Sequence, residues 1–169
     1  MTHPFTIRPF DPASERELNH LCVFSTMTLW ESRPELRVDP DSIADFGFEA
    51  HRKLYLAGAD QPNTKSLIAL DKDAKIVGHS VVVLRHKEGQ PYGYFWSRYV
   101  LPQYRRQGLA RTFLKEALSW FQSQGASWAE VHIHVENGAL RGMFESEGFS
   151  VIDRRTDRWT YLVLRKDLS

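Results

Sequence analysis

The chain has a single cysteine, Cys22, among its 169 residues. One cysteine cannot form an internal disulfide or a multi-cysteine metal site, and such scarcity is typical of proteins in a reducing compartment. The sequence also lacks a basic segment followed by an apolar run near its start, and it lacks any apolar stretch of membrane-spanning length. We therefore expect a cytoplasmic protein that is not exported and has no membrane partner.

An excess of one charge is absent as well. The 22 basic and 21 acidic side chains leave a formal net charge of +1, which does not indicate a nucleic-acid partner. No repeat, low-complexity tract or linker is visible, and the hydrophobic (42%) and charged (25%) fractions are near the averages for globular proteins. The length is close to that of one domain. We expect residues 1–169 to form a single domain.

In the first half of the chain, short strand patterns surround two helical ones. Strands are expected over residues 5–10, 67–70 and 75–84, and the last two are joined by a hairpin turn at 71–74. A helix is expected from an N-cap at Ser14, with Glu17 three residues on, to Trp30. A second helix is expected within residues 41–57, although Gly47 lies inside that segment.

In the second half, the pattern alternates more regularly. A turn at 89–93 precedes an aromatic strand at 94–100, which Pro102 ends. The apolar stripe from Leu109 to Phe121 predicts a helix that stops at Gly125, and the alternation over 128–135 predicts a strand. A short helix at 138–147 and strands at 149–154 and 158–164 follow. The order indicates an α+β (mixed α/β) fold with helices packed on a sheet.

The segment between residues 100 and 110 is the most informative one. A strand passes through Pro102 into Arg105-Arg106-Gln107-Gly108 and then into the clearest helix. Amides at a helix start are unpaired and point outward, and the helix dipole favours negative charge there, so this turn suits a pyrophosphate. An ordinary strand-to-helix turn with solvated arginines explains the segment equally well, because short glycine motifs recur by chance.

Downstream residues make the interpretation specific. Arg105-Arg106-Gln107-Gly108-Leu109-Ala110 resembles the acetyl-CoA pyrophosphate loop of the GNAT family of N-acetyltransferases, and residues 137–149 resemble that family's second conserved segment. The motifs cover roughly residues 94–149, and the order of elements matches too. The resemblance implies a GNAT-like central mixed, mostly antiparallel sheet of about seven strands flanked by about four helices.

The resemblance also implies which residues bind acetyl-CoA. Backbone groups of 98–100 would pair with the pantetheine arm and the acetyl carbonyl, amides of 106–111 would hold the pyrophosphate, and Asn137 would contact the arm. The expected coenzyme-binding residues are Arg98, Tyr99, Val100, Arg105, Arg106, Gln107, Gly108, Leu109, Ala110, Arg111, Asn137 and Phe144.

Phe144 departs from the family pattern. Many members have a tyrosine at this position, where it is the candidate acid for the leaving thiolate, and phenylalanine has no proton to give. An alkyl thiol has a pKa of about 8.5, so at neutral pH the missing proton is worth roughly 2 kcal/mol. Water or another side chain can supply that proton, and catalysis is not excluded.

The candidate base differs as well. Some relatives have a glutamate five residues before the asparagine, where this chain has His132, and others have one at the position of Tyr94. Imidazole is well suited to take a proton from an ammonium nucleophile, so His132 is the candidate base and Tyr94 the alternative. A simple structural role explains His132 equally well and explains His134 better. The two histidines lack a convincing third ligand, so we expect no metal.

The sequence thus predicts an enzyme, an acetyl-CoA-dependent N-acetyltransferase in which an amine attacks the thioester directly, without a covalent enzyme intermediate. The acceptor is an amine of a small molecule or a protein, and a homodimer is left open. Glu31, Asp45 or Glu49 could hold a cationic acceptor, but solvation explains most such carboxylates better, so none of them is assigned to the site. The alternative is a non-catalytic acyl-CoA-binding or regulatory module.

Overall fold

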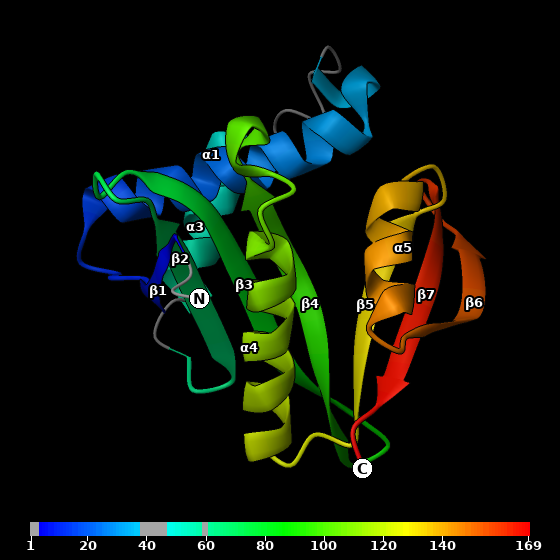
Figure 1. The fold of residues 1–169 in the computed structure, drawn as a ribbon. Helices are drawn as coiled ribbons and strands as arrows, with labels where there is room; N and C mark the ends of the chain where they lie inside the picture. Colours follow the sequence, from blue (N-terminus) through cyan, green and yellow to red (C-terminus); the bar gives the residue numbers. More distant parts are fainter. Residues whose placement is uncertain (1–3, 38–46, 59–60) are drawn as a thin grey trace. The chain divides into compact units, whose positions relative to one another are not determined.

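The computed structural model describes residues 4–37, 47–58 and 61–169. Seven strands form one sheet in the order β1-β2-β3-β4-β5-β7-β6 (Figure 1). They are β1 (Thr6–Pro9), β2 (Thr64–Leu70), β3 (Ile76–Lys87), β4 (Gln90–Val100), β5 (Trp128–His134), β6 (Ser150–Thr156) and β7 (Thr160–Asp167). The described helices are α1 (Glu15–Ser32), α3 (Phe48–Gly58), α4 (Leu109–Ser123) and α5 (Gly138–Ser146), with 3-10 turns η1 (Pro34–Arg37) and η2 (Pro102–Tyr104).

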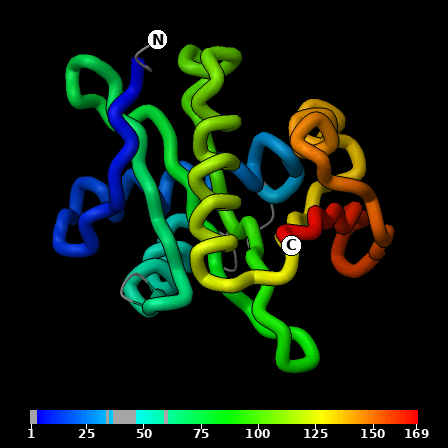
Figure 2. Tube along the Cα trace, turned by 60° about the horizontal axis from the view of Figure 1, so that its bottom comes forward, coloured from blue at the N-terminus to red at the C-terminus, as the bar shows by residue number. Residues whose placement is uncertain are grey.

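Both the α+β class and the mixed sheet are confirmed. The pair β1–β2 is antiparallel (Figure 2), as are β5–β7 and β6–β7. The pair β4–β5 is parallel and joins residues 93–95 to residues 129–131. A parallel neighbour needs a long crossover connection, and the chain between β4 and β5 contains α4.

The chain forms two compact units, residues 1–81 with 97–113 and residues 82–96 with 114–169. Strands β3 and β4 and helix α4 contribute residues to both. Each unit has its own apolar core, and the single domain stays a prediction.

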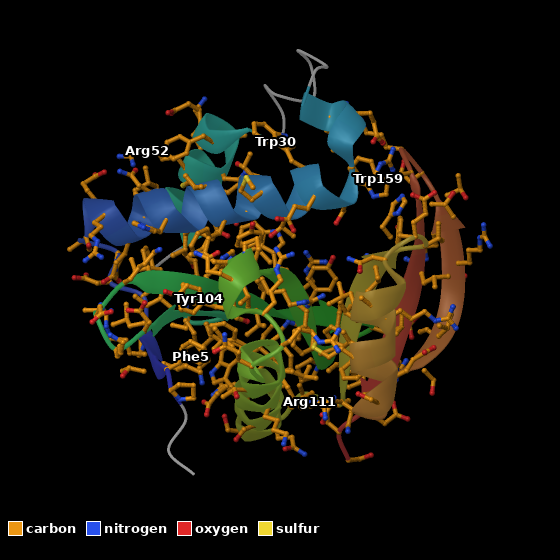
Figure 3. The ribbon with its side chains drawn as sticks, turned by 45° about the horizontal axis from the view of Figure 1, so that its top comes forward. Phe5, Trp30, Arg52, Tyr104, Arg111 and Trp159 are labelled. Atoms are coloured by element: carbon orange, nitrogen blue, oxygen red, sulfur yellow. The ribbon has the colours of Figure 1, made fainter. Side chains whose placement is uncertain are left out.

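The first unit is organised around the start of α4. The core residues Phe5, Leu67, Ala69, Val77, Leu109 and Phe113 pack together there. Phe5, which directly precedes β1, also meets the ring of Tyr104 edge to face at 6.1 Å, and Figure 3 labels both side chains. Tyr104 in turn donates a hydrogen bond to Asp71 Oδ2 (2.7 Å). These contacts tie the segment before α4 to the start of β1 and to the β2–β3 turn.

Ser14 caps α1 as predicted, since its hydroxyl accepts a hydrogen bond from the Glu17 N–H (3.3 Å). The Glu17 carboxylate accepts from the backbone of Asp11 (2.7 Å) and pairs with Arg8 at 2.5 Å. Burial alone would raise the pKa of Glu17, but Arg8 and the Asp11 amide lower it below its usual value. Glu17 therefore fastens the start of α1 to β1 as an ionised carboxylate.

The second unit has an aromatic core. Phe95 meets Phe121, Phe144 and Phe149 edge to face, with ring centres 5.2 to 6.0 Å apart. Val131 and Ile133 of β5 face this core, whereas Glu130 and His132 do not, as the alternation predicts. The helices of this unit, α5 and most of α4, are fastened to the sheet through these residues.

The turn expected at 89–93 is wrong. The structure has a two-residue turn at Glu88 and Gly89, both with positive φ (52° and 80°), and β4 already begins at Gln90. Gly93 lies within the strand. The residue is a glycine because a Cβ at this position would come within 2.3 Å of the Phe121 ring. Its glycine thus marks a close approach of α4, which sequence alone does not distinguish from a turn.

The helix expected over residues 41–57 is confirmed in its second part as α3, and residues 41–46 lie outside the described residues. Gly47 stands before the helix rather than inside it, where its carbonyl accepts the hydrogen bond of the His51 N–H (3.2 Å). An ion pair between Arg52 of α3 and Glu15 of α1 (3.1 Å) joins the two helices.

A chain of buried and half-buried polar side chains crosses the first unit. The Tyr55 and Ser25 hydroxyls are 2.5 Å apart, Ser25 lies 3.0 Å from Ser97, and Ser97 lies 2.9 Å from His79 Nε2. His79 is fully buried beneath Phe24, and among the described residues its Nδ1 has no hydrogen-bond partner. Burial, aided by the charges of His51 and Arg98, lowers the pKa of His79 to about 3.

We expect His79 to make the fold sensitive to acid. Below about pH 6.5 the imidazole of His79 is protonated in the unfolded chain, whereas in the folded chain it stays neutral down to about pH 3. The free energy of unfolding therefore decreases as the pH falls from about 6.5 to about 3. The loss should reach about 2 kcal/mol near pH 5. Urea unfolding of His79→Gln should show a smaller decrease between neutral pH and pH 5 than wild type. The control is His86→Gln, an exposed position on the same strand; equal decreases in all three proteins would contradict this prediction.

Candidate functional site

The turn between β4 and α4 has backbone conformations that suit an anion. Pro102 ends β4 and begins η2. Beyond it, Arg106 and Gly108 have positive φ angles of 64° and 83°, and α4 begins at Leu109. Left-handed residues in such turns direct successive N–H groups to one side, as in anion-binding nests. We call residues 105–111 the phosphate turn.

The start of α4 adds donors to the phosphate turn. The first backbone hydrogen bond of the helix runs from the Thr112 N–H to the Gly108 carbonyl (3.0 Å), and amides ahead of it point outward along the axis. The first helical turn carries no acidic side chain, so the helix dipole there attracts anions without competition. The phosphate turn therefore fits a phosphate or pyrophosphate group.

Arg105 has protein partners that the sequence does not predict. Its guanidinium pairs with Glu31 of α1 (2.7 Å), and its Nε donates to the Val100 carbonyl (2.8 Å). The other Glu31 oxygen accepts from the Tyr99 hydroxyl (2.6 Å). Burial, together with Glu31, raises the pKa of Tyr99 to about 12. Glu31, considered above as a ligand for a cationic acceptor, instead anchors the phosphate turn to α1, and Asp45 lies outside the described residues.

The residues of the phosphate turn differ in exposure. Arg106 and Arg111 are exposed, as are Arg105, Gln107 and Gly108. Gln107 donates to the Gln103 carbonyl (3.3 Å), whereas Leu109 is buried in the core of the first unit and Ala110 is half-buried. The predicted residues of this turn thus divide into an exposed set that can meet a ligand and a buried set that fixes the helix.

The end of β4 presents one edge to β3 and one edge away from it. The Leu101 N–H donates to Val77 of β3, and the Tyr99 carbonyl lies 2.9 Å from where a Cβ of Gly78 would stand. The carbonyls of Arg98 and Val100 accept instead from side chains, those of Thr28 (2.9 Å) and Arg105 (2.8 Å). Since backbone groups alternate along a strand, residues 98 and 100 share the edge that faces away from β3.

In the second unit, the structure brings His132 and Tyr94 together. The His132 ring meets Tyr94 edge to face at 5.1 Å and stacks on Tyr161 at 5.0 Å. Tyr161 reaches it from β7 as a diagonal neighbour, because its direct partner in the register is His134. His132 keeps a quarter of its side chain exposed. The imidazole is therefore held between two rings and remains accessible.

The hydrogen bond of His132 determines which nitrogen carries the proton. His132 Nε2 lies 2.8 Å from Glu130 Oε1. This bond lowers the pKa of Glu130 below its usual value although burial opposes the shift, so the carboxylate is ionised at neutral pH. An ionised carboxylate only accepts, so Nε2 is the donor, and in the neutral ring Nδ1 carries the lone pair. Nδ1 is thus the atom that can accept a proton.

Tyr94 is less suited to act as a base. Its burial raises its pKa above the usual value, with a smaller opposing effect of Arg85. A phenol with a raised pKa stays protonated at neutral pH and can donate a hydrogen bond but not take a proton. Of the two predicted base residues, the geometry and the charges favour His132.

Asn137 and Phe144 both have clear structural roles. The Asn137 side chain caps α5 by accepting from the Leu140 N–H (3.2 Å), which leaves its amide NH₂ to donate. Phe144 is completely buried in the aromatic core, 4.9 Å from Phe149. Its ring therefore packs against the aromatic rings of Phe95 and Phe149. Contact of either residue with the coenzyme stays a prediction.

Sequence reasoning did not identify Glu130 and Tyr161 as site residues. Glu130 could have been found, since residues two apart on a strand share a face and a carboxylate beside a histidine is a common pairing. Tyr161 could not, because its position beside His132 depends on the register of β5 with β7. His134 accepts from the Glu136 N–H (3.3 Å), which agrees with the structural role preferred for it.

Comparison with known families gives one match. The model of the Acetyltransferase (GNAT) family matches residues 27–149, more than half of the chain. The matched segment includes β4, the phosphate turn, His132 and α5. No curated protein sequence matches the chain.

Solved structures with this fold share little sequence with the chain. The NatC complex bound to Gag peptide and CoA includes a chain with a TM-score of 0.75 and 18% identity, and the match covers 98% of this chain and 99% of that one. The PaiA N-acetyltransferase from Thermoplasma acidophilum with coenzyme A has a TM-score of 0.71 and 16% identity, and the match covers 96% of this chain and 98% of that one. Spermidine N-acetyltransferase from Vibrio cholerae with CoA and spermine has a TM-score of 0.70 and 15% identity, and the match covers 99% of this chain and 97% of that one.

Two further features are absent from the part of the chain that the structure describes. No described helix has the length and apolar character needed to cross a membrane. Nowhere in the described ranges do three histidine, cysteine or carboxylate side chains gather as metal ligands would.

Proposed function

Because this chain belongs to the acetyltransferase (GNAT) family, we propose that it transfers the acetyl group of acetyl-CoA to a primary amine. The observation that carries the proposal is the phosphate turn, in which Arg106 and Gly108 adopt left-handed conformations directly before an acid-free helix start. This geometry suits the pyrophosphate of coenzyme A. The CoA-bound structures that share the fold support the same coenzyme.

The β4 edge that faces away from β3 would bind the rest of the coenzyme. Backbone groups of Arg98 and Val100 lie on that edge, and extended backbone pairs naturally with an amide-containing arm such as pantetheine. An N–H there that stabilises charge on the thioester oxygen lowers the barrier to attack. Glu31 and Arg105 hold this strand end and the phosphate turn together, so both parts keep their geometry.

The proposed base is Nδ1 of His132. A primary amine with a pKa near 10 is almost fully protonated at neutral pH, so a base has to take a proton before or during attack. Glu130 accepts from Nε2 and thereby stabilises the imidazolium that forms when Nδ1 takes that proton. Glu130 is a positioning residue, because it acts through His132.

Transfer is direct in this proposal. The one cysteine, Cys22, is completely buried, and burial raises the pKa of its thiol to about 11, so it offers no nucleophile. The thiolate that leaves would take its proton from water or from imidazolium, since Phe144 has none to give. A reducing cytoplasm is the location that we propose, because it fits this unpaired thiol.

The alternative is a module that binds acyl-CoA without catalysis, which the missing acid at Phe144 favours. Two measurements on the same protein separate the two functions: the binding of acetyl-CoA by calorimetry, and the release of CoA with a broad panel of amines. We expect both binding and release that depends on the amine. Binding without release from any amine would favour the alternative, and no binding at all would contradict both.

A further inference from the structure

Four side chains form a row across the second unit, one from each of four neighbouring strands. The Arg85 guanidinium of β3 lies over the Tyr94 ring at 3.7 Å from its centre. Tyr94 of β4 meets His132 of β5 at 5.1 Å, and His132 stacks on Tyr161 of β7 at 5.0 Å. The ring of Tyr94 therefore contacts both the guanidinium of Arg85 and the imidazole of His132, the proposed base.

Among the described residues, Arg85 has no ion pair of the kind that two other arginines of the second unit make. Arg155 pairs with Asp153 (2.7 Å) and Arg165 pairs with Asp167 (3.2 Å). Arg85 is exposed, and no carboxylate of the described residues lies within ion-pair distance of it. Stacking on an aromatic ring fixes the plane of a guanidinium while leaving its N–H edge to bind an anion.

Carboxylates that could attract a polycation are already engaged in this region. Strands β5, β6 and β7 carry Glu130, Asp153 and Asp167. Glu130 binds His132, and the other two hold arginines. Each carboxylate of these strands thus already has a cationic or imidazole partner, and Arg85 would repel the second ammonium group of a polyamine.

We propose that Arg85 binds a carboxylate of the acceptor, so that the acceptor is an α-amino acid rather than a polyamine. This inference rests on the proposed function and identifies its substrate class. Tyr94 and Tyr161 would flank the acceptor with their rings, His132 Nδ1 would face its amine, and Arg85 would bind its carboxylate at the other end.

The spacing of the row agrees with this class. Arg85 and His132 lie 3.7 and 5.1 Å from the centre of the same ring, which places the two groups within about 9 Å of each other. A hydrogen bond at each end takes up about 3 Å of that distance. At most about 3 Å then remains between the amine and the carboxylate, as in an α-amino acid.

The test compares acceptors that differ in one charge. The panel holds the common amino acids and several dipeptides, each beside its C-terminal amide, together with spermidine, and kcat/KM is measured for each. Because the guanidinium should recognise only the carboxylate, Arg85→Gln should lower kcat/KM for the best acid by tenfold or more and change that for its amide less than twofold. Arg85→Lys should restore part of the loss.

The control is Lys87→Gln, which removes another exposed cation of β3 and should leave both values near wild type. Equal losses for the acid and the amide in Arg85→Gln, or a wild-type preference for spermidine, would overturn the proposed acceptor class while leaving acetyl transfer intact. Failure of every amine to release CoA would be a different result, because it overturns the proposed function and this inference with it.

Discussion

Gly108→Glu should weaken acetyl-CoA binding by at least about a hundredfold, the largest effect that we expect from any single substitution. Gly108 has a φ of 83°, a conformation that costs any other L residue of this size free energy. The new carboxylate would also stand at the helix start, where the pyrophosphate needs positive potential. Calorimetric titration with acetyl-CoA measures the change directly.

Strain alone has to be separated from loss of the anion site. Gly89 provides the control, because its φ is 80° and, apart from its chain neighbours, no described residue has an atom within 4 Å of where its Cβ would stand. Gly89→Glu should show similar strain in thermal unfolding and wild-type affinity for acetyl-CoA. If Gly108→Glu binds as tightly as Gly89→Glu, the phosphate turn is not the pyrophosphate site.

His132→Ala should lower kcat by more than about tenfold while acetyl-CoA still binds, since this substitution removes the base but leaves the phosphate turn intact. The pH–rate profile should also lose its acidic limb, because a general base has to be unprotonated to act. Steady-state kinetics over a range of pH, with calorimetry at one pH, measures both. Glu130→Gln should move that limb without removing it, because the imidazole remains but loses its anionic partner.

Two control variants show whether a loss of rate belongs to the His132 imidazole itself. His134→Ala removes the next histidine on the same strand and should leave the rate near that of wild type, because His134 binds a backbone amide. Tyr94→Phe removes the hydroxyl that is the alternative base. If Tyr94→Phe loses the acidic limb and His132→Ala keeps it, the assignment of the base to His132 is wrong.

The fold was predictable because several local signals agreed. The apolar stripe of α4, the Ser14 cap and the alternation along β5 each depend on neighbours in the sequence, and all are present in the structure. The start of β4 was not predictable, because the glycine at position 93 makes room for the ring of Phe121, nearly thirty residues away. A glycine that permits close packing and a glycine that makes a turn look the same in one sequence.

The part of the candidate site that is formed by backbone groups could be predicted from the sequence. The phosphate turn follows from a proline, a glycine and a helix start, and the structure gives it the positive φ angles of an anion site. Side-chain partners were harder to predict. Arg105 was expected beside a phosphate, and its pairing with Glu31, in a helix more than seventy residues earlier, was not predicted. Such a pairing depends on tertiary packing, which leaves no local pattern.

The same limit applies to the base. His132 could be selected by its position and chemistry, but the tautomer depends on Glu130 and the stacking depends on Tyr161. Arg85, which lies nearly fifty residues before His132, has no sequence signal that joins the two. Only the sheet order, β3 beside β4 and β4 beside β5, brings them into one row.

The central claim is that acetyl-CoA donates its acetyl group to an amine, and transfer of an isotope-labelled acetyl group tests it most directly. The protein is incubated with labelled acetyl-CoA and a mixture of amino acids, dipeptides and spermidine, and the amines are analysed by mass spectrometry. We predict a labelled N-acetyl product in amounts equal to the free CoA, formed by wild type and by Gly89→Glu but not by Gly108→Glu. Bound acetyl-CoA with no labelled amine of any class would contradict the claim.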